Sequence, residues 1–87
     1  MQAALTAKVI FRTQLHPERT HDPIDYPVNL TTAQIHDDII VRLEHKYWFG
    51  GQNMFAFFDE QEREFISPRP DRYLLGGHVY AVSVTYK

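Results

Sequence analysis

Hydrophobic and polar residues alternate along residues 5–13. The odd-numbered positions from 5 to 11 are apolar, and the even-numbered positions are polar apart from Ile10. A period of two residues is typical of a β-strand with one buried face. We therefore expect a strand here, with Ile10 either exposed on the polar face or covered by a neighbouring element.

Residues 24–29 show the same alternation, and a polar, turn-rich connection over residues 14–23 joins them to the first strand. The pattern predicts a second strand and a hairpin. Pro27 lies inside this strand, and proline has no N–H group to donate to a neighbouring strand. The second strand is therefore expected at an edge of the sheet.

The strongest local signal begins at Leu30, where the sequence reads Leu-Thr-Thr-Ala-Gln-Ile. Thr31 as the N-cap, with Gln34 three residues later, forms the capping-box pattern that begins many helices. Apolar residues then recur every four positions, at Ile35, Ile39, Leu43 and Tyr47. Such a stripe is typical of an amphipathic helix. Gly50 and Gly51 provide the stop, and the predicted helix covers about residues 32–48.

Three further strands are expected after the helix. Residues 54–58 and 63–66 form a hairpin around a polar turn, and residues 79–86 form the final strand. This last strand is β-branched and aromatic on both faces, which favours a central position. Pro68 and Pro70 prevent a second helix between residues 59 and 75.

The sequence therefore predicts one α+β domain over residues 1–87. A mixed sheet of four to five strands packs against the single helix, and the first and last strands run parallel at its centre. A ferredoxin-like fold needs a second helix, which the two prolines exclude.

With this order of elements, the chain resembles the ubiquitin-like β-grasp superfamily over essentially its whole length. The resemblance rests on four segments: Lys8–Phe11, Leu30–Thr32, Phe57–Glu60 and Leu74–Val82. DIX, PB1 and doublecortin-type modules are the most similar in length and element order. The resemblance implies a domain without catalysis that pairs with partners or with itself through strands. The lysine and acidic motifs of PB1 pairing are not clearly present, so no binding residues are transferred.

Composition narrows the function further. The chain has 87 residues, a formal net charge of −2 and no cysteine. Without cysteine it has no disulfide scaffold and no thiolate metal site. No segment has the basic surplus that nucleic-acid binding exploits, and no apolar run is long enough for a membrane span. No leader opens the sequence, so we expect a cytoplasmic protein without membrane contact.

Candidate chemistry is sparse. The five histidines include no pair at the i, i+4 spacing that places two imidazoles on one helical face, so no metal site is expected. An acid/base pair could combine Asp37 or Asp38 with His36 or His45, but adjacent helical positions point in different directions. No phosphate loop or nucleophile motif is present. We expect no catalytic residues and no cofactor.

Two surfaces are candidates for partner binding. Trp48 and Val41 lie seven residues apart, off the apolar stripe of the predicted helix, and could form an exposed anchor. Alternatively, Trp48 folds over the helix end as a lid on the core. The second surface is an acidic turn with an open strand edge beside it, which could meet a basic partner or be simply solvated. Its residues are Asp59, Glu60, Glu62 and Glu64.

These observations predict a small adaptor or regulatory protein that binds another protein, or itself, by surface docking or strand pairing. Two alternatives remain open. One is an auxiliary subunit of a multi-component enzyme, and the other is an inhibitor that masks a nucleic-acid-handling complex.

Overall fold

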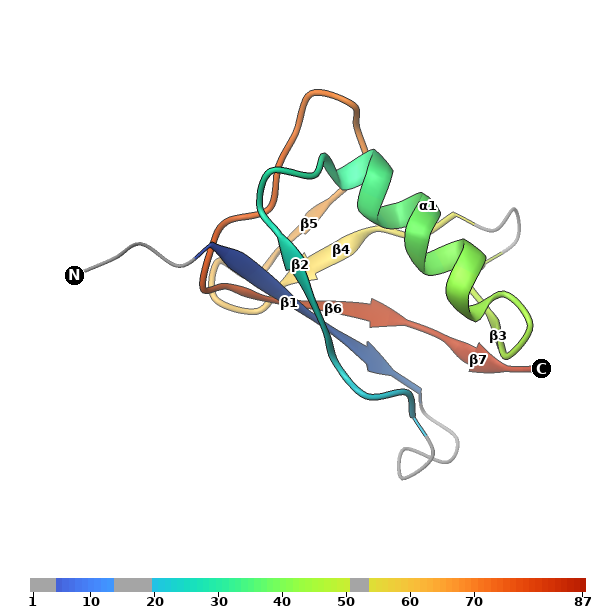
Figure 1. Ribbon diagram of the computed structural model, residues 1–87. Helices are drawn as coiled ribbons and strands as arrows, with labels where there is room; N and C mark the ends of the chain where they lie inside the picture. The colour runs from blue at the N-terminus through green and yellow to red at the C-terminus, as the bar shows by residue number, and fades with distance from the viewer. Residues whose placement is uncertain (1–4, 14–19, 51–53) are drawn as a thin grey trace.

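Two strands that are distant in sequence lie side by side at the centre of the fold. In the computed structural model, which describes residues 5–13, 20–50 and 54–87, β1 (Thr6–Arg12) pairs in parallel with β6 (Val79–Ser83). They are neighbours in a five-stranded sheet of order β2-β1-β6-β4-β5 (Figure 1). The expected parallel pairing of the first strand with the last long strand is therefore confirmed.

The other strands pair antiparallel around this central pair. In the main sheet, β2 (Ile24–Pro27) lies beside β1, β4 (Phe57–Asp59) lies beside β6, and β5 (Glu64–Ile66) forms the far edge. A second, two-stranded sheet pairs β3 (Tyr47–Trp48) with β7 (Thr85–Tyr86). Together with α1 (Thr32–Leu43), the one helix in the described ranges, these strands make a small α+β domain with a mixed five-stranded sheet.

The core lies between α1 and one face of the sheet. The helix contributes Ile35, Ile39 and Leu43 to it. The sheet contributes alternate residues, because side chains on a strand point to opposite faces. In β1 these residues are Ala7, Val9 and Phe11, as the alternation predicted. Facing residues of the other sheet strands include Tyr26, Phe57, Ile66, Tyr80 and Val82.

The start of α1 is held by the predicted capping box. The Thr31 hydroxyl accepts from the Gln34 N–H at 3.1 Å, and the Gln34 side chain accepts from the Thr31 N–H at 2.9 Å. The next residue, Thr32, is fully buried and joins the helix to the loop after β5. Its hydroxyl accepts from the Arg69 N–H at 2.8 Å and donates to the Arg69 carbonyl at 3.1 Å.

The helix is shorter than predicted. It ends at Leu43, not near residue 48, and the N–H of the C-cap residue Glu44 makes its bond to Ile40. A turn then leads into β3, where Tyr47 is fully buried. The four-residue apolar period runs on to Tyr47 because a buried strand residue happens to fall at the next helical position. Gly50 follows at φ +121°, and Gly51 lies outside the described residues.

Several strand boundaries also differ from the prediction. The expected final strand over residues 79–86 is divided into β6 and β7 at Val84, whose N–H donates to the carbonyl of Arg12. The chain there leaves the main sheet to pair with β3. β6 itself is central, as predicted, because it lies between β1 and β4. The expected strand over residues 54–58 begins only at Phe57.

Pro27 lies at the edge of the sheet, as predicted. The N–H of Val28 donates to the Leu5 carbonyl, so by the alternation of antiparallel ladders the backbone groups of Tyr26 face β1. Those of Asp25 and Pro27 face away from the sheet. The residue without an N–H therefore occupies a position where no neighbouring strand needs one.

We predict that Thr32→Val lowers the free energy of unfolding by about 1–2 kcal/mol, because the Arg69 N–H loses its acceptor while side-chain volume is kept. Urea unfolding followed by circular dichroism measures this. Thr85→Val is the matched control at an exposed position of β7, and equal losses in the two variants would contradict the role of Thr32.

Candidate functional site

A row of apolar side chains crosses the face of the sheet opposite α1. Strand register places Ile10 of β1 opposite Ala81 of β6, Ala81 opposite Phe58 of β4, and Phe58 opposite Phe65 of β5. The four residues therefore form one line over four strands. Ile10, which broke the polar face of its strand in the sequence, is the first member of this row.

The row ends in an aromatic pair, in which Phe58 is half-buried and Phe65 is exposed. The rings of Phe58 and Phe65 lie 4.9 Å apart between centroids, and Phe65 is 72% exposed. The Glu60 N–H donates to the Val79 carbonyl, so by alternation the backbone groups of Phe58 also face β6. Phe58 and Phe65 are then a non-hydrogen-bonded pair, the kind in which cross-strand side chains approach most closely.

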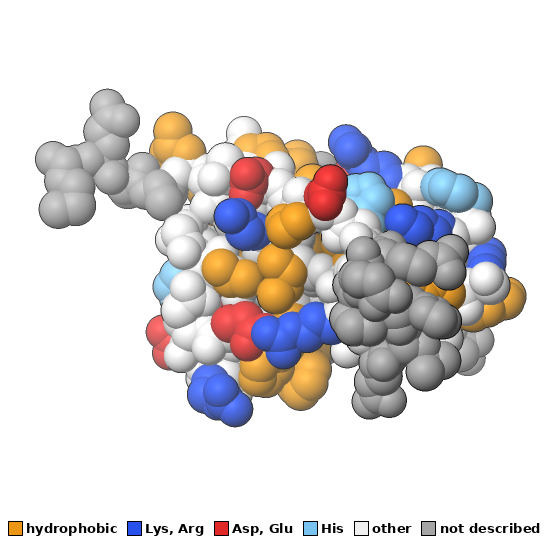
Figure 2. Space-filling model, turned by 90° about the horizontal axis from the view of Figure 1, so that it is seen from below, with side chains coloured by type: hydrophobic (Ala, Val, Ile, Leu, Met, Phe, Trp, Pro, Cys, Tyr) orange, Lys and Arg blue, Asp and Glu red, His pale blue; other side chains and the backbone are white. Residues whose placement is uncertain are grey.

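Two adjoining hollows make the region concave. The first, of about 410 Å³, adjoins the aromatic pair and is lined by Arg12, Phe49, Phe55, Ala56, Phe58, Phe65, Ala81 and Ser83. The second, of about 810 Å³, is lined by Arg12, Thr13, Trp48, Phe49, Gly50, Ser83, Val84 and Thr85. They share three lining residues, so they form one groove from β5 to β3. Viewed from below, the molecule presents apolar side chains with charged ones beside them (Figure 2).

One ion pair crosses the apolar row. Arg12 stands opposite Ser83 on one side of the row, whereas Glu60 stands opposite Val79 on the other side. The guanidinium of Arg12 nevertheless contacts the Glu60 carboxylate. The long arginine side chain must therefore pass over the row near Ala81, which is buried although it lies on the open face. This ion pair divides the apolar surface and supplies a cation to both hollows.

The predicted surface of Val41 and Trp48 required both residues to lie on one helix, and the structure does not place them so. Trp48 belongs to β3, not to α1, so the seven-residue spacing does not place the two side chains on one helical face. Val41 is 75% exposed on α1. Trp48 is 54% exposed, lines the larger hollow and carries the Lys87 ammonium 4.5 Å from its ring centroid. Trp48 is thus a surface residue of the groove and not a buried lid.

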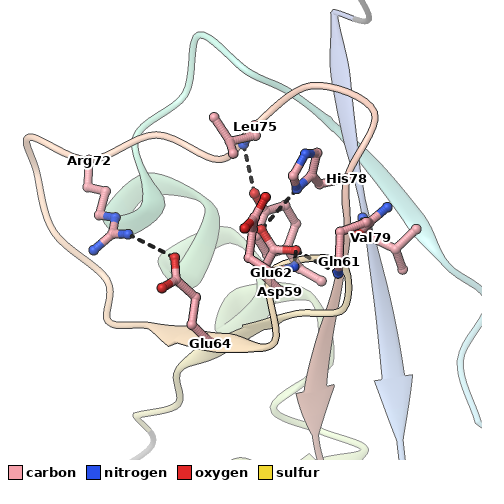
Figure 3. Close-up of polar contacts among 9 residues, drawn as sticks. Asp59, Gln61, Glu62, Glu64, Arg72, Leu75, His78 and Val79 are labelled. Atoms are coloured by element: carbon pink, nitrogen blue, oxygen red, sulfur yellow. Dashed lines mark hydrogen bonds and ion pairs between the residues drawn. The ribbon is translucent and has the colours of Figure 1, made fainter.

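Asp59, expected as part of an acidic docking surface, is 1% exposed and organises the turn between β4 and β5. One carboxylate oxygen accepts from the N–H groups of Gln61 and Glu62 at 2.9 and 3.1 Å. The other lies 3.0 Å from Nδ1 of His78, at the entry to β6 (Figure 3). Burial alone raises the pKa of Asp59, but the hydrogen bonds from Glu62, His78 and Gln61 outweigh it and hold the pKa below its ordinary value.

The other three acidic candidates do not form one surface. The Glu60 carboxylate forms an ion pair with Arg12, and the Glu60 side chain is largely buried. Glu62 is exposed on the turn, and Glu64 is exposed on β5 with its carboxylate 3.9 Å from the Arg72 guanidinium. Two of the four predicted residues, Glu62 and Glu64, are therefore available to a partner.

Three of the four described histidines, His21, His36 and His78, make local contacts, and His45 is exposed. His36 is buried against Phe55, with 4.4 Å between ring centroids, and His21 donates its backbone N–H to the Tyr47 hydroxyl at 2.7 Å. His16 lies outside the described residues. Within the described ranges, no group of three or more His, Asp or Glu side chains is placed to hold a metal ion. The helix present there is too short and too polar to cross a membrane.

Sequence reasoning missed Phe65 and the open face it belongs to. Phe65 was expected only as part of the strand over residues 63–66 of the hairpin. The sequence did contain a signal for it, the alternation of side chains between the two faces of a strand. Phe65 and Ile66 are consecutive, so only one of these two apolar side chains can face the core. The core position belongs to Ile66, which is 3% exposed.

Comparison of the chain with protein-family models, with curated proteins and with solved structures finds no match.

Because the folded-state pKa of Asp59 is depressed, its ionised form stabilises the fold above the pKa of an unfolded aspartate, about 3.9. That contribution is lost as the pH falls through the lower folded value. We predict that Asp59→Asn destabilises the protein by about 1–3 kcal/mol at pH 7. The difference from wild type should shrink below about pH 4. Urea unfolding at pH 7, 5 and 3 measures it, and a difference that does not change with pH contradicts the assignment.

Proposed function

We propose that this chain is a ubiquitin-like β-grasp domain that acts in the cytoplasm, without catalysis, by binding another protein in the groove on the open face of its sheet. Its strand order, the parallel pairing of β1 with β6 and the single helix over one face all agree with a β-grasp arrangement.

The single observation that carries the docking proposal is the contact of the exposed Phe65 ring with the half-buried Phe58 ring in the lining of the smaller hollow. Contiguous exposed apolar surface, especially beside polar groups, marks protein–protein interaction sites and binding grooves. Aromatic side chains are also enriched among the residues that dominate binding energy. A partner side chain placed in this hollow would contact Phe65, Phe58 and the aliphatic part of Arg12.

The second end of the groove supports an extended partner segment. Trp48 lines the larger hollow, and the two hollows meet at Arg12, Phe49 and Ser83. A segment that lies along the groove would pass the guanidinium of Arg12 between two aromatic anchors. An acidic or polar residue in the middle, with an apolar residue on each side, fits this order of groups. An adaptor role, an auxiliary enzyme subunit and an inhibitor would each use such a groove.

We predict that Phe65→Ser reduces partner recovery at least about tenfold, since truncating a central interface aromatic costs about 2 kcal/mol or more. The chain is used as bait in its native host, with chemical cross-linking and mass spectrometry to identify the partner and the sites of contact. Trp48→Ala should reduce recovery as well, and cross-links should join the partner to residues of the groove.

Leu75→Ser is the matched control, because Leu75 is 52% exposed but lines neither hollow. Val41→Ser tests the helical surface in the same way. The proposal fails if Val41→Ser abolishes recovery while Phe65→Ser retains it. Thermal unfolding of each variant separates loss of binding from loss of fold.

A further inference from the structure

The two edges of the sheet differ in what they offer another strand. At the β2 edge, the outward positions are Asp25 and Pro27, and Pro27 has no N–H. At the β5 edge the outward position is Phe65, because its pairing with Phe58 is of the non-hydrogen-bonded kind. Its N–H and C=O therefore both point away from β4. The neighbouring residues Glu64 and Ile66 direct their groups inward.

We propose that β5 pairs antiparallel with β5 of a second copy of this chain, around a two-fold axis at Phe65, to form a symmetric dimer with a continuous ten-stranded sheet. The proposal uses the backbone edge of β5, whereas a partner would lie in the groove, but the Phe65 ring takes part in both. Sedimentation of the purified chain tests the dimer alone, and recovery of a partner from the host tests the groove.

The register of this pairing follows from the symmetry. A two-fold axis that passes between two antiparallel strands pairs one residue with itself and the residues on either side with each other. With Phe65 on the axis, its N–H donates to the C=O of Phe65 in the other copy, and the reciprocal bond forms as well. No hydrogen bond of the original β4–β5 ladder is broken.

The charge pattern of β5 is compatible with a second copy as the occupant. In this register Glu64 of one chain stands opposite Ile66 of the other, and Arg63 stands opposite Ser67. No two like charges face one another directly, which is the arrangement that antiparallel pairs require. A two-fold axis at Glu64 would place Glu64 opposite its own copy, and like charges directly opposite one another are destabilising.

The exposed aromatic ring gives the pairing its apolar contact. Residues opposite one another in an antiparallel pair lie on the same face of a sheet, so the two Phe65 rings meet on the open face. Each ring already contacts Phe58 of its own chain. The apolar rows of the two copies then join into a single row over eight strands, and the solvent-exposed surface of Phe65 is covered.

The contact is small, because β5 has three residues. Interfaces well below 1,200 Å² are typical of weak complexes, so we expect a dissociation constant of about 10 μM to 1 mM. Sedimentation equilibrium from about 5 μM to 2 mM should fit a monomer–dimer equilibrium with no larger species. In the same range, amide exchange measured by NMR should slow at Phe65 with rising concentration.

Phe65→Pro is the decisive variant. It removes the outward N–H and the ring, but no hydrogen bond to β4, so the domain should fold and stay monomeric. Its dissociation constant should rise at least about tenfold. Asp25→Pro is the matched control, since it removes an outward N–H at the opposite edge and should leave dimerisation unchanged. Phe65→Thr keeps the N–H and should weaken the dimer less than Phe65→Pro does.

Several outcomes would overturn the proposal. These are a monomer at all concentrations, a dimer that survives Phe65→Pro, a dimer that Asp25→Pro disrupts, and assembly beyond two copies. If Phe65→Pro does not fold by circular dichroism, the concentration dependence of amide exchange at Phe65 in the wild-type chain decides the question. Unchanged exchange at that residue contradicts the pairing.

Discussion

The parallel pairing of β1 with β6 is the constraint on which the rest of the molecule depends. Parallel neighbours cannot be joined by a tight turn, so the chain between them must cross over the sheet. That connection contains α1, and the helix covers one face only. No helix or strand of the described residues covers the opposite face. The same pairing sets Ile10 against Ala81 and Arg12 against Ser83, so it determines which side chains line the open face.

Asp59 links this central pair to the hairpin of β4 and β5. Its carboxylate holds the turn through two backbone N–H groups and reaches His78 immediately before β6. The next residue, Glu60, bonds through its backbone to Val79 and through its side chain to Arg12. A buried charge thus fixes the position of an ion pair whose acidic member is largely buried. Asp59 and Glu60 of the acidic turn hold the hairpin against the central strands, and only the exposed residues Glu62 and Glu64 are available to a partner.

Much of the fold could be read from the sequence because local signals and tertiary structure agree. The alternation around Val9, the capping box at Thr31 and the edge position of Pro27 each have one physical explanation, and each is found. The end of the helix could not be read this way. Tyr47 fits the helical stripe as well as it fits a buried strand, and only its pairing with Tyr86, far along the chain, decides between them.

The candidate site was harder to predict because it depends on strand register. Ile10, Ala81, Phe58 and Phe65 come from four separate segments, and nothing local to any of them indicates that they align. Trp48 was singled out for a helical spacing that the structure does not have, because α1 ends at Leu43. Asp59 was singled out for its charge, whereas burial and three hydrogen bonds determine what it does. Long-range contacts thus control the site more than they control the individual elements.

The absent donor at Pro27 also bears on how far such a sheet can grow. A filament built by edge-to-edge pairing of sheets requires every subunit to have two sheet edges that can each form backbone hydrogen bonds with a neighbouring subunit. In this chain the β2 edge has two outward-facing residues. Pro27 lacks a backbone N–H, and Asp25 carries a carboxylate side chain. Filaments built by edge addition are therefore disfavoured, and the chain is protected on that side against amyloid-like polymerisation.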